Sequence, residues 1–277
     1  MSDWLQVHQG GAPLIVSFPH TGTVLPDEIV PRLVSPWLAR KDADWWVRRL
    51  YDFAETLGAT TVRTAVSRTV IDVNRDPSGA SLYPGQATTE LCPTTSFDGE
   101  ALYKGGQAPD AAEIAARTAR WFAPYHAALT AEIERLKADH GRVVLYEAHS
   151  IRSRIPRLFE GELPNFNIGD FSGASCDPAL TAAVEAGCDG DGFSRVTNGR
   201  FKGGWTTRHY GAPALGVHAI QMELACRGYM DEPVEPPTEA DWPSPYDPAR
   251  AAPMRAALTR VLNACLAFAR SWPGTRS

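Results

Sequence analysis

Two histidines in this sequence stand where strands are expected to end, with small residues beside them. His20 follows the apolar run PLIVSF, and His149 lies just beyond the apolar run RVVLY. A catalytic zinc ion takes three protein ligands from His, Asp or Glu and keeps a fourth position for water. His20 and His149 are therefore the first candidates for metal ligands. The alternative for each is a core histidine that hydrogen-bonds a backbone carbonyl.

The third metal ligand is less clear, because the sequence contains no HxxE or HExxH arrangement. Asp42 and Asp44 stand at the start of a predicted helix, from which a carboxylate can reach back toward the histidines. Asp42 suits the helix N-cap, which favours Asp44 as the ligand and leaves Asp42 as the alternative. Glu147 is a further candidate, because it shares a strand face with His149 and could instead orient that histidine.

Glu223 lies inside the otherwise apolar run AIQMELA. Burying an ionised carboxylate in such a run is costly unless a metal or a cation compensates its charge. In a zinc hydrolase a glutamate of this kind takes a proton from water and passes it to the leaving amine. Glu223 is therefore the candidate catalytic residue, and a buried pair with an arginine is the alternative.

Asn74 and Arg75 follow Asp72 at the end of a β-branched run. An arginine side chain is a planar fork suited to paired hydrogen bonds with a carboxylate, and Asp72 is placed to hold it. The sequence thus predicts that Asn74 and Arg75 bind a carboxylate of the substrate. A solvated ion pair between Arg75 and Asp76 is the alternative.

Further basic residues gather in two segments, IRSRIPR directly after His149 and the Gly-rich NGRFKGGWTTRHYG. They are expected to make the edge of the site electropositive and suited to a small anionic substrate. The residues of these segments predicted to contact the substrate are Arg152, Arg154, Lys202, Arg208 and His209. A mobile loop is the alternative for the Gly-rich segment.

The elements that must position these side chains alternate between strands and helices. Strands are predicted at 13–18, 60–66, 69–73, 142–146 and 217–224, with one bent strand as the alternative to the second and third. Helices are predicted at 42–57, 110–139 and 248–269, and the segments 152–211 and 231–248 are expected to be loop-rich. Gly58 suits the end of the first helix, Asp110 caps the second, and Pro124 should kink the second helix or split it in two.

This order of elements predicts an α/β fold with a mixed, largely parallel sheet sandwiched by helices, in one domain spanning residues 1–277. Ligands of such folds bind beyond the carboxyl ends of the strands. The residues expected to converge there are His20, Asn74, Arg75, His149 and Glu223.

The composition fits a globular protein, with 277 residues, 44% of them hydrophobic, and a net charge of -5. No dense Lys/Arg run is present, so nucleic acid is not an expected partner. The sequence has no long apolar span and no apparent leader, which predicts a cytoplasmic protein that does not enter a membrane. Five scattered cysteines predict neither disulfides nor a thiolate metal site, and only Cys176 lies in a context where a reactive thiol is conceivable.

Several motifs, in this order, resemble the N-formylglutamate amidohydrolase family. They are SFPHTG at 17–22, VNRD at 73–76, GASLYP at 79–84, AHSIRSR at 148–154 and NGRFKGG at 198–204. The resemblance extends from about residue 13 to residue 231, and several long motifs in one order are far more specific than a single short one.

The resemblance implies a fold similar to that of the zinc carboxypeptidases, in which an Asn-Arg pair binds the substrate carboxylate, a His-Ser pair supplies a zinc ligand and a Phe-Glu-Leu strand carries the catalytic glutamate. Asn74-Arg75, His149-Ser150 and Met222-Glu223-Leu224 match these three motifs. It implies one zinc ion, held here by His20, His149 and, by inference, Asp44. Glu223 would be base and then acid. The implied reaction is hydrolysis of N-formyl-L-glutamate to formate and L-glutamate, the last step of a bacterial route of histidine degradation.

Two other readings stay open at this point. A carboxypeptidase or another N-acyl-amino-acid amidohydrolase would use the same residues on a different substrate. A non-catalytic amino-acid-binding protein would need the arginines but would have no use for Glu223 beside two histidines. The sequence does not predict an oligomeric state.

Overall fold

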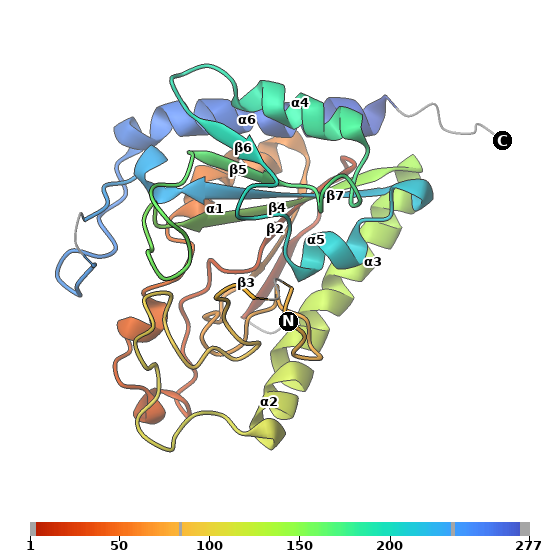
Figure 1. The fold of residues 1–277 in the computed structure, drawn as a ribbon. Helices are drawn as coiled ribbons and strands as arrows, with labels where there is room; N and C mark the ends of the chain where they lie inside the picture. Colours follow the sequence, from red (N-terminus) through yellow and green to blue (C-terminus); the bar gives the residue numbers. More distant parts are fainter. Residues whose placement is uncertain (1–3, 83–84, 234–235, 272–277) are drawn as a thin grey trace.

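A seven-stranded sheet forms the centre of the protein, which we describe from a computed structural model for residues 4–82, 85–233 and 236–271 (Figure 1). The strands are β1 (Leu5–His8), β2 (Leu14–Phe18), β3 (Thr60–Thr64), β4 (Val143–Ile151), β5 (Phe166–Gly169), β6 (Arg195–Thr197) and β7 (Val217–Ala225). Their order is β1-β3-β2-β4-β7-β5-β6. Four pairs are parallel and the β1–β3 and β5–β7 pairs are antiparallel. The prediction of a mixed, largely parallel sheet is confirmed.

Helices cover both faces of this sheet. The α-helices are α1 (Val47–Leu50), α2 (Ala111–Arg117), α3 (Ala123–His140), α4 (Pro178–Cys188), α5 (Trp205–Tyr210) and α6 (Pro248–Arg270). Figure 1 shows α4 and α6 along one face, and α3 and α5 on the other. None of the helices in the described part of the chain has the length and apolar character that a membrane span requires.

The two faces of the sheet carry separate cores, because side chains alternate along each strand. In β4, Val144 and Tyr146 pack into the core beneath α4 and α6. Val143 and Leu145 pack on the opposite face, in the core that α3 contributes to. By the same alternation Glu147 and His149 lie on the α3 face, beyond the apolar part of the strand.

Most of the predicted elements on either side of the site are confirmed. The strands predicted at 13–18, 60–66, 142–146 and 217–224 correspond to β2, β3, β4 and β7, and the last predicted helix is α6. Asp110 caps α2 by accepting a hydrogen bond from the backbone N–H of Glu113. A π-helical turn, Thr118–Phe122, separates α2 from α3 just before Pro124, which agrees with the predicted interruption.

The continuous helix predicted at 42–57 is wrong. The helix α1 begins only at Val47, preceded by Trp46 at φ 65°, and a 3-10 segment then runs to Leu57. Asp42 is not an N-cap, because its Oδ2 accepts a hydrogen bond from the distant backbone N–H of Phe97 at 2.6 Å. Gly58 does end the segment, at φ 75°, as predicted.

The strand predicted at 69–73 is also wrong, because side chains in this segment bond to nearby backbone groups and favour turns. Ser67 Oγ accepts from the backbone N–H of Thr69, and Asp72 Oδ1 accepts from that of Asn74. The segment 152–211 is less loop-rich than expected, since it contains β5, α4, β6 and α5. The edge strand β1 was not predicted.

All five cysteines are free and buried. Burial raises the pKa of the Cys176 thiol to about 11, so this residue behaves as a small core side chain rather than a reactive thiol. The 79–84 motif and the 231–248 segment each extend outside the described residues.

Candidate active site

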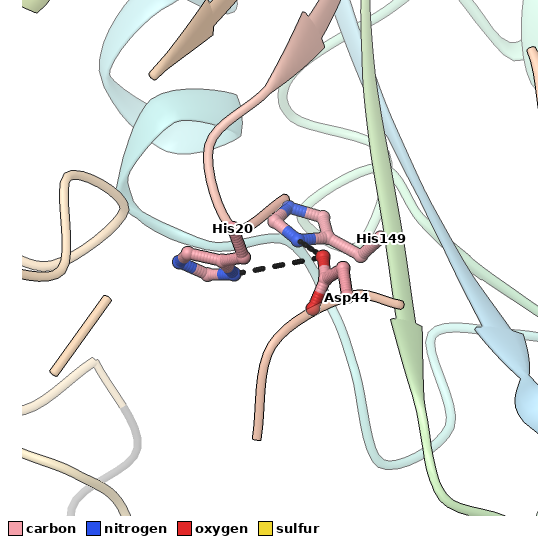
Figure 2. A group of neighbouring side chains, drawn as sticks. All are labelled: His20, Asp44 and His149. Atoms are coloured by element: carbon pink, nitrogen blue, oxygen red, sulfur yellow. Dashed lines mark hydrogen bonds and ion pairs between the residues drawn. The ribbon is translucent and has the colours of Figure 1, made fainter. Parts of the chain in front are cut away.

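Three buried side chains from distant parts of the chain meet at the carboxyl ends of β2 and β4 (Figure 2). His20 follows β2, His149 belongs to β4, and Asp44 lies in the turn before α1. The backbone N–H of Asp44 donates to the carbonyl of His20 at 2.9 Å, which fixes the turn against the end of β2. One potential ligand atom from each residue lies within 4.8 Å of the others.

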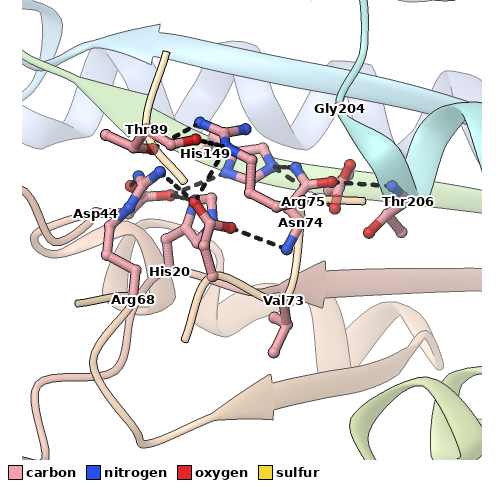
Figure 3. A network of polar contacts seen from close by, with 12 residues as sticks. His20, Asp44, Arg68, Val73, Asn74, Arg75, Thr89, His149, Gly204 and Thr206 are labelled. Atoms are coloured by element: carbon pink, nitrogen blue, oxygen red, sulfur yellow. Dashed lines mark hydrogen bonds and ion pairs between the residues drawn. The ribbon is translucent and has the colours of Figure 1, made fainter. Parts of the chain in front are cut away.

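The two histidines direct the same ring nitrogen toward Asp44. His149 Nδ1 lies 3.1 Å and His20 Nδ1 lies 3.8 Å from Asp44 Oδ2. The opposite nitrogen of each ring is held by another polar group (Figure 3). His20 Nε2 lies 2.6 Å from Asp72 Oδ1, and His149 Nε2 lies 3.2 Å from Asn74 Nδ2. Metal-binding histidines are commonly oriented by such a group on the far side of the ring.

The cluster fits a zinc ion by its chemistry. Two imidazoles and one carboxylate make a ligand set that catalytic zinc accepts. Asp44 Oδ1 is buried and accepts no hydrogen bond within the described part of the chain, and its ion-pair distance to Arg68 Nη1 is 3.9 Å. Burying a negatively charged oxygen with so distant a positive partner costs free energy, and a cation bound at this position would offset that cost.

The electrostatics of the two histidines differ. Burial lowers the pKa of His20, and the nearby Arg68 lowers it further, against Asp72 and Asp44. Burial also lowers the pKa of His149, but hydrogen bonds and charges from Asp44 and Glu147 outweigh this effect and raise the pKa to about 10. Because a metal binds neutral imidazole, a metal ion at this cluster would compete with a proton for His149.

Glu223 lies directly beside His149 because β4 and β7 pair in parallel with these two residues in register. Its side chain lines a cavity of about 70 Å³ that His20 and His149 also line. Burial and the charge of Asp44 raise the pKa of Glu223 to about 8, against the effects of His149, Arg68 and Arg75. A carboxyl group with a pKa near neutrality is suited both to accept and to donate a proton.

Arg75 and Asn74 lie at the same cavity. Arg75 donates from Nε to the carbonyl of Thr89 and from Nη2 to Thr89 Oγ1, both at 3.1 Å. Asn74 Oδ1 accepts from the backbone N–H of Thr206 at 2.9 Å, which links the site to α5. A Cβ at Gly204 would lie 2.3 Å from Asn74 Nδ2, so this close approach requires glycine.

Five residues predicted to contact the substrate are not among the described residues that line this cavity. They are Arg152, Arg154, Lys202, Arg208 and His209. The structure does bring the other six predicted site residues together, namely His20, Asp44, Asn74, Arg75, His149 and Glu223.

The two arginines after His149 turn away from the cavity because acidic residues hold them elsewhere. Arg152 Nη2 lies 2.6 Å from Asp98 Oδ2, and Arg154 Nη2 lies 2.8 Å from Glu162 Oε2.

Two of the basic residues in and near α5 are also held by contacts within the protein. Arg208 donates to the carbonyls of Gly203 and Leu82 at 2.9 Å. The ring of His209 stacks on Trp205 with centroids 4.1 Å apart, and Lys202 is exposed. A role for any of these residues in substrate binding stays a prediction.

A model of the N-formylglutamate amidohydrolase family matches residues 12–230, which include the whole site. The chain belongs to this family. It is 46% identical over 271 residues to an N-formylglutamate deformylase of Pseudomonas aeruginosa, covering 98% of each chain. It is also 46% identical over 269 residues to one of Pseudomonas putida, covering 97% of each chain.

A crystal structure of an N-formylglutamate amidohydrolase from Ralstonia eutropha JMP134 has the same fold. Its TM-score is 0.78 at 23% identity, over 96% of this chain and 98% of that chain. The similarity to zinc carboxypeptidases stays a prediction.

Three residues at the site of this amidohydrolase were not predicted from the sequence. Arg68 and Arg200 line the cavity, and Asp72 holds His20. Asp72 was expected to hold Arg75, but that contact is 3.7 Å, while Arg68 Nη2 lies 2.7 Å from Asp72 Oδ2. The NGRFKGG motif pointed to the loop of Arg200, whereas no local signal marked Arg68.

His126 of this amidohydrolase contacts the segment that carries Asn74. Its burial leads us to expect a pH effect on stability. It lies 2.8 Å from the carbonyl of Val73, next to Asn74, and 3.0 Å from the hydroxyl of Tyr210. Burial lowers the pKa of His126 to about 4, against the hydrogen bond to Val73. An unfolded histidine titrates near 6.5, so between these values the unfolded chain binds more protons and stability falls as the pH falls.

We expect His126→Gln, which keeps a donor for Val73 but cannot titrate, to lose part of this pH dependence. The wild-type free energy of unfolding should decrease by up to about 1.4 kcal/mol per pH unit through this group as the pH falls from about 6.5 to 4. Urea unfolding at several pH values measures both slopes. Equal slopes in the two proteins would show that folding does not lower the pKa of His126.

Proposed function

We propose that this chain is a zinc-dependent amidohydrolase that cleaves N-formyl-L-glutamate into formate and L-glutamate. The observation that carries this proposal is the position of Glu223 beside the cluster of His20, Asp44 and His149. Glu223 lies there in a cavity that arginine side chains also line. The names of its full-length relatives in two Pseudomonas species support the substrate. The reaction would complete a route of histidine degradation.

His20 and His149 would hold the zinc ion through their Nδ1 atoms. Asp44 would hold it through one of its two carboxylate oxygens. Zinc bound there supplies Lewis-acid chemistry, because it polarises a carbonyl group and lowers the pKa of water. Asp72 keeps His20 in one orientation, and Glu147 and Asn74 do so for His149. The cluster is thereby arranged before the substrate arrives.

Glu223 moves the proton that the hydrolysis requires. The attacking water gives one proton to the Glu223 carboxylate while its oxygen adds to the formyl carbon. Glu223 then passes this proton to the amide nitrogen as the C–N bond breaks, the remaining hydroxyl proton passes to the released amine, and L-glutamate leaves with formate. The burial of Glu223 excludes bulk water from this transfer.

Arg75 binds the carboxylate next to the scissile amide. Its position beside Asn74 and near Asp72 places a positive charge close to the metal cluster, and Thr89 orients the guanidinium. The α-carboxylate of an N-formyl amino acid lies one carbon from the reacting nitrogen, so it must bind near that cluster. This arrangement orients the amide toward Glu223.

The proposal is tested by incubating the purified protein with N-formyl-L-glutamate and measuring both products. We expect formate and glutamate to appear in equal amounts and at the same rate. Release of a C-terminal residue from peptides, without formate release, would instead indicate a peptidase. Stable binding of N-formyl-L-glutamate without turnover would indicate a non-catalytic binding protein.

Arg75→Lys should lower kcat/KM for N-formyl-L-glutamate about 5- to 150-fold, because the lysine keeps the charge but loses the paired, planar hydrogen bonds. An analogue in which the α-carboxylate is replaced by an amide should be poor for the wild type and no worse for the variant. Steady-state formate release measures all four values. Arg120→Lys, which changes an exposed arginine paired with Glu28, is the matched control. An equal loss on both substrates would place Arg75 in the fold or at the reacting atoms.

A further inference from the structure

A second polar side chain of β7 lines the cavity beside Glu223. Gln221 lies two residues before Glu223, so the alternation of side chains along a strand places both on the same face. Both residues line the cavity. The parallel strand β4 runs alongside, with Glu147 opposite Gln221 and His149 opposite Glu223. Gln221 therefore lies one strand repeat deeper in the sheet than Glu223, away from the carboxyl end of β7.

The orientation of the Gln221 side-chain amide is fixed by its oxygen. Oε1 accepts a hydrogen bond from the backbone N–H of Gly204 at 2.7 Å. Because a backbone N–H can only donate, the atom that faces Gly204 must be the oxygen, and the other atom of the amide must be the nitrogen. Gly204 is the residue directly before α5, so this bond also ties β7 to the start of that helix.

The nitrogen of the same amide has no hydrogen-bond partner among the described residues. Gln221 is buried, and the bond to Gly204 is the single hydrogen bond of its side chain within the described part of the chain. Unlike Glu147 Oε1, which is unpartnered and fully enclosed, Gln221 Nε2 reaches accessible space, and the cavity is the space that this residue lines. An unpaired amide N–H in a buried place costs free energy, and a ligand with an acceptor oxygen would offset that cost.

The proposed reaction determines how far the substrate side chain extends from Glu223. Glu223 gives its proton to the amine nitrogen, so this nitrogen must lie beside Glu223. An extended glutamate side chain spans roughly 5 Å from that nitrogen to its carboxyl carbon, and residues two apart on a strand are separated by roughly 6.6 Å. These lengths are comparable, so the side-chain carboxylate can reach the amide of Gln221 while the amine lies at Glu223.

Arg75 is available for the other branch of the substrate, its α-carboxylate. The Arg75 guanidinium is held by Thr89, on a segment outside the sheet, whereas Gln221 lies within the sheet between β4 and β5. Among the described residues, the two side chains have different hydrogen-bond partners. A substrate whose α-carboxylate binds Arg75 can thus direct its side chain along β7 to Gln221.

We propose that Gln221 Nε2 donates a hydrogen bond to the side-chain carboxylate of the N-formyl amino acid and so favours substrates whose side chain ends in an acceptor oxygen. This inference rests on the proposed function and assigns a specificity-determining residue to it. The amide is held by Gly204 before the substrate arrives, so little side-chain entropy is lost on binding. A substrate without the acceptor oxygen leaves this buried donor unpaired, which is the basis of the selection.

The test compares N-formyl-L-glutamate with N-formyl-L-norvaline, which keeps the α-carboxylate and the carbon chain but ends in a methyl group. Gln221→Met keeps the length of the side chain and removes the donor. It should lower kcat/KM for the glutamate compound about 10- to 150-fold and leave the value for the norvaline compound within about threefold. Steady-state formate release measures both values.

A second variant separates the donor from the contact with Gly204. Gln221→Glu keeps an oxygen for the Gly204 N–H but replaces the donor with another oxygen, so it should lose the preference for the glutamate compound as well. Gln107→Met, which changes an exposed glutamine of a loop, is the matched control and should behave as the wild type.

Activity on the norvaline compound also shows whether each variant is folded. An equal loss on both compounds would mean that Gln221 supports the structure through Gly204 or Glu147, and it overturns the inference. An unchanged preference in either variant overturns it too. A wild type that hydrolyses both compounds equally has the same consequence, although the proposed hydrolysis of N-formyl amino acids would stand. If the wild type releases formate from neither compound, the proposed function itself fails and takes the inference with it.

Discussion

Replacing Glu223 with glutamine should lower kcat about 10²- to 10⁴-fold while the protein keeps about one zinc ion per chain. The substitution keeps the shape of the side chain but removes its ability to accept a proton. Glu223 is in register with His149 and lines the same cavity, but it is not one of the three clustered candidate ligands. Proton transfer should therefore be lost without loss of the metal.

The measurement combines formate release with metal analysis of the same preparation. Glu134→Gln is the control, because Glu134 is an exposed residue of α3 paired with Lys137. Near-normal turnover in Glu223→Gln would reassign the base, with Glu147 as the next candidate. Glu147 is buried, lies 3.7 Å from His149 Nε2 and accepts a hydrogen bond from Thr207 Oγ1.

His149→Ala and His20→Ala should each lose most of the zinc and nearly all of the activity. Each substitution removes one of only three protein ligands, and a two-ligand remnant holds zinc much more weakly. Metal analysis after extensive dialysis measures the loss, and circular dichroism shows whether the sheet is intact. Full metal retention in both variants would contradict the site.

The third ligand can be tested with a pair of neighbouring aspartates. Asp44→Asn should lose zinc, because Asp44 Oδ2 faces both histidines. Asp42→Asn should retain it, because Asp42 is engaged by the backbone N–H of Phe97 and lies 3.7 Å from Arg152. The opposite pattern would make Asp42 the ligand.

The residues that could be placed from the sequence are those at the ends of buried strands. A strand covered on both faces is a short apolar run that stands out in the sequence, and a polar residue directly after it must lie at the edge of the sheet. His20 and His149 follow such runs, and Glu223 interrupts one. Their convergence follows from strand direction alone.

The residues that could not be placed depend on contacts between distant loops. Arg152 and Arg200 each lie within a motif that contains a second basic residue, yet of these two only Arg200 lines the cavity. The difference lies in their partners, since Asp98 holds Arg152 and the carbonyls of two loops hold Arg200. Sequence spacing carries no information about such pairings.

The turn around Asp44 illustrates a third case, in which the position of a residue beside the two histidines was predicted although its local structure was not. A helix from 42 to 57 was expected, whereas the segment before Val47 is a turn fixed by the backbone contact between Asp44 and His20. Local helix propensity was overridden by this tertiary contact and by Trp46 in a left-handed conformation.

The most direct test of the account is a zinc titration of protein that has been stripped of metal with a chelator, followed by formate release from N-formyl-L-glutamate. We predict negligible activity without zinc, a linear increase as zinc is added, and a plateau at about one ion per chain. Full activity of the stripped protein, or a plateau that is independent of added zinc, would contradict metal-dependent hydrolysis at the cluster of His20, Asp44 and His149.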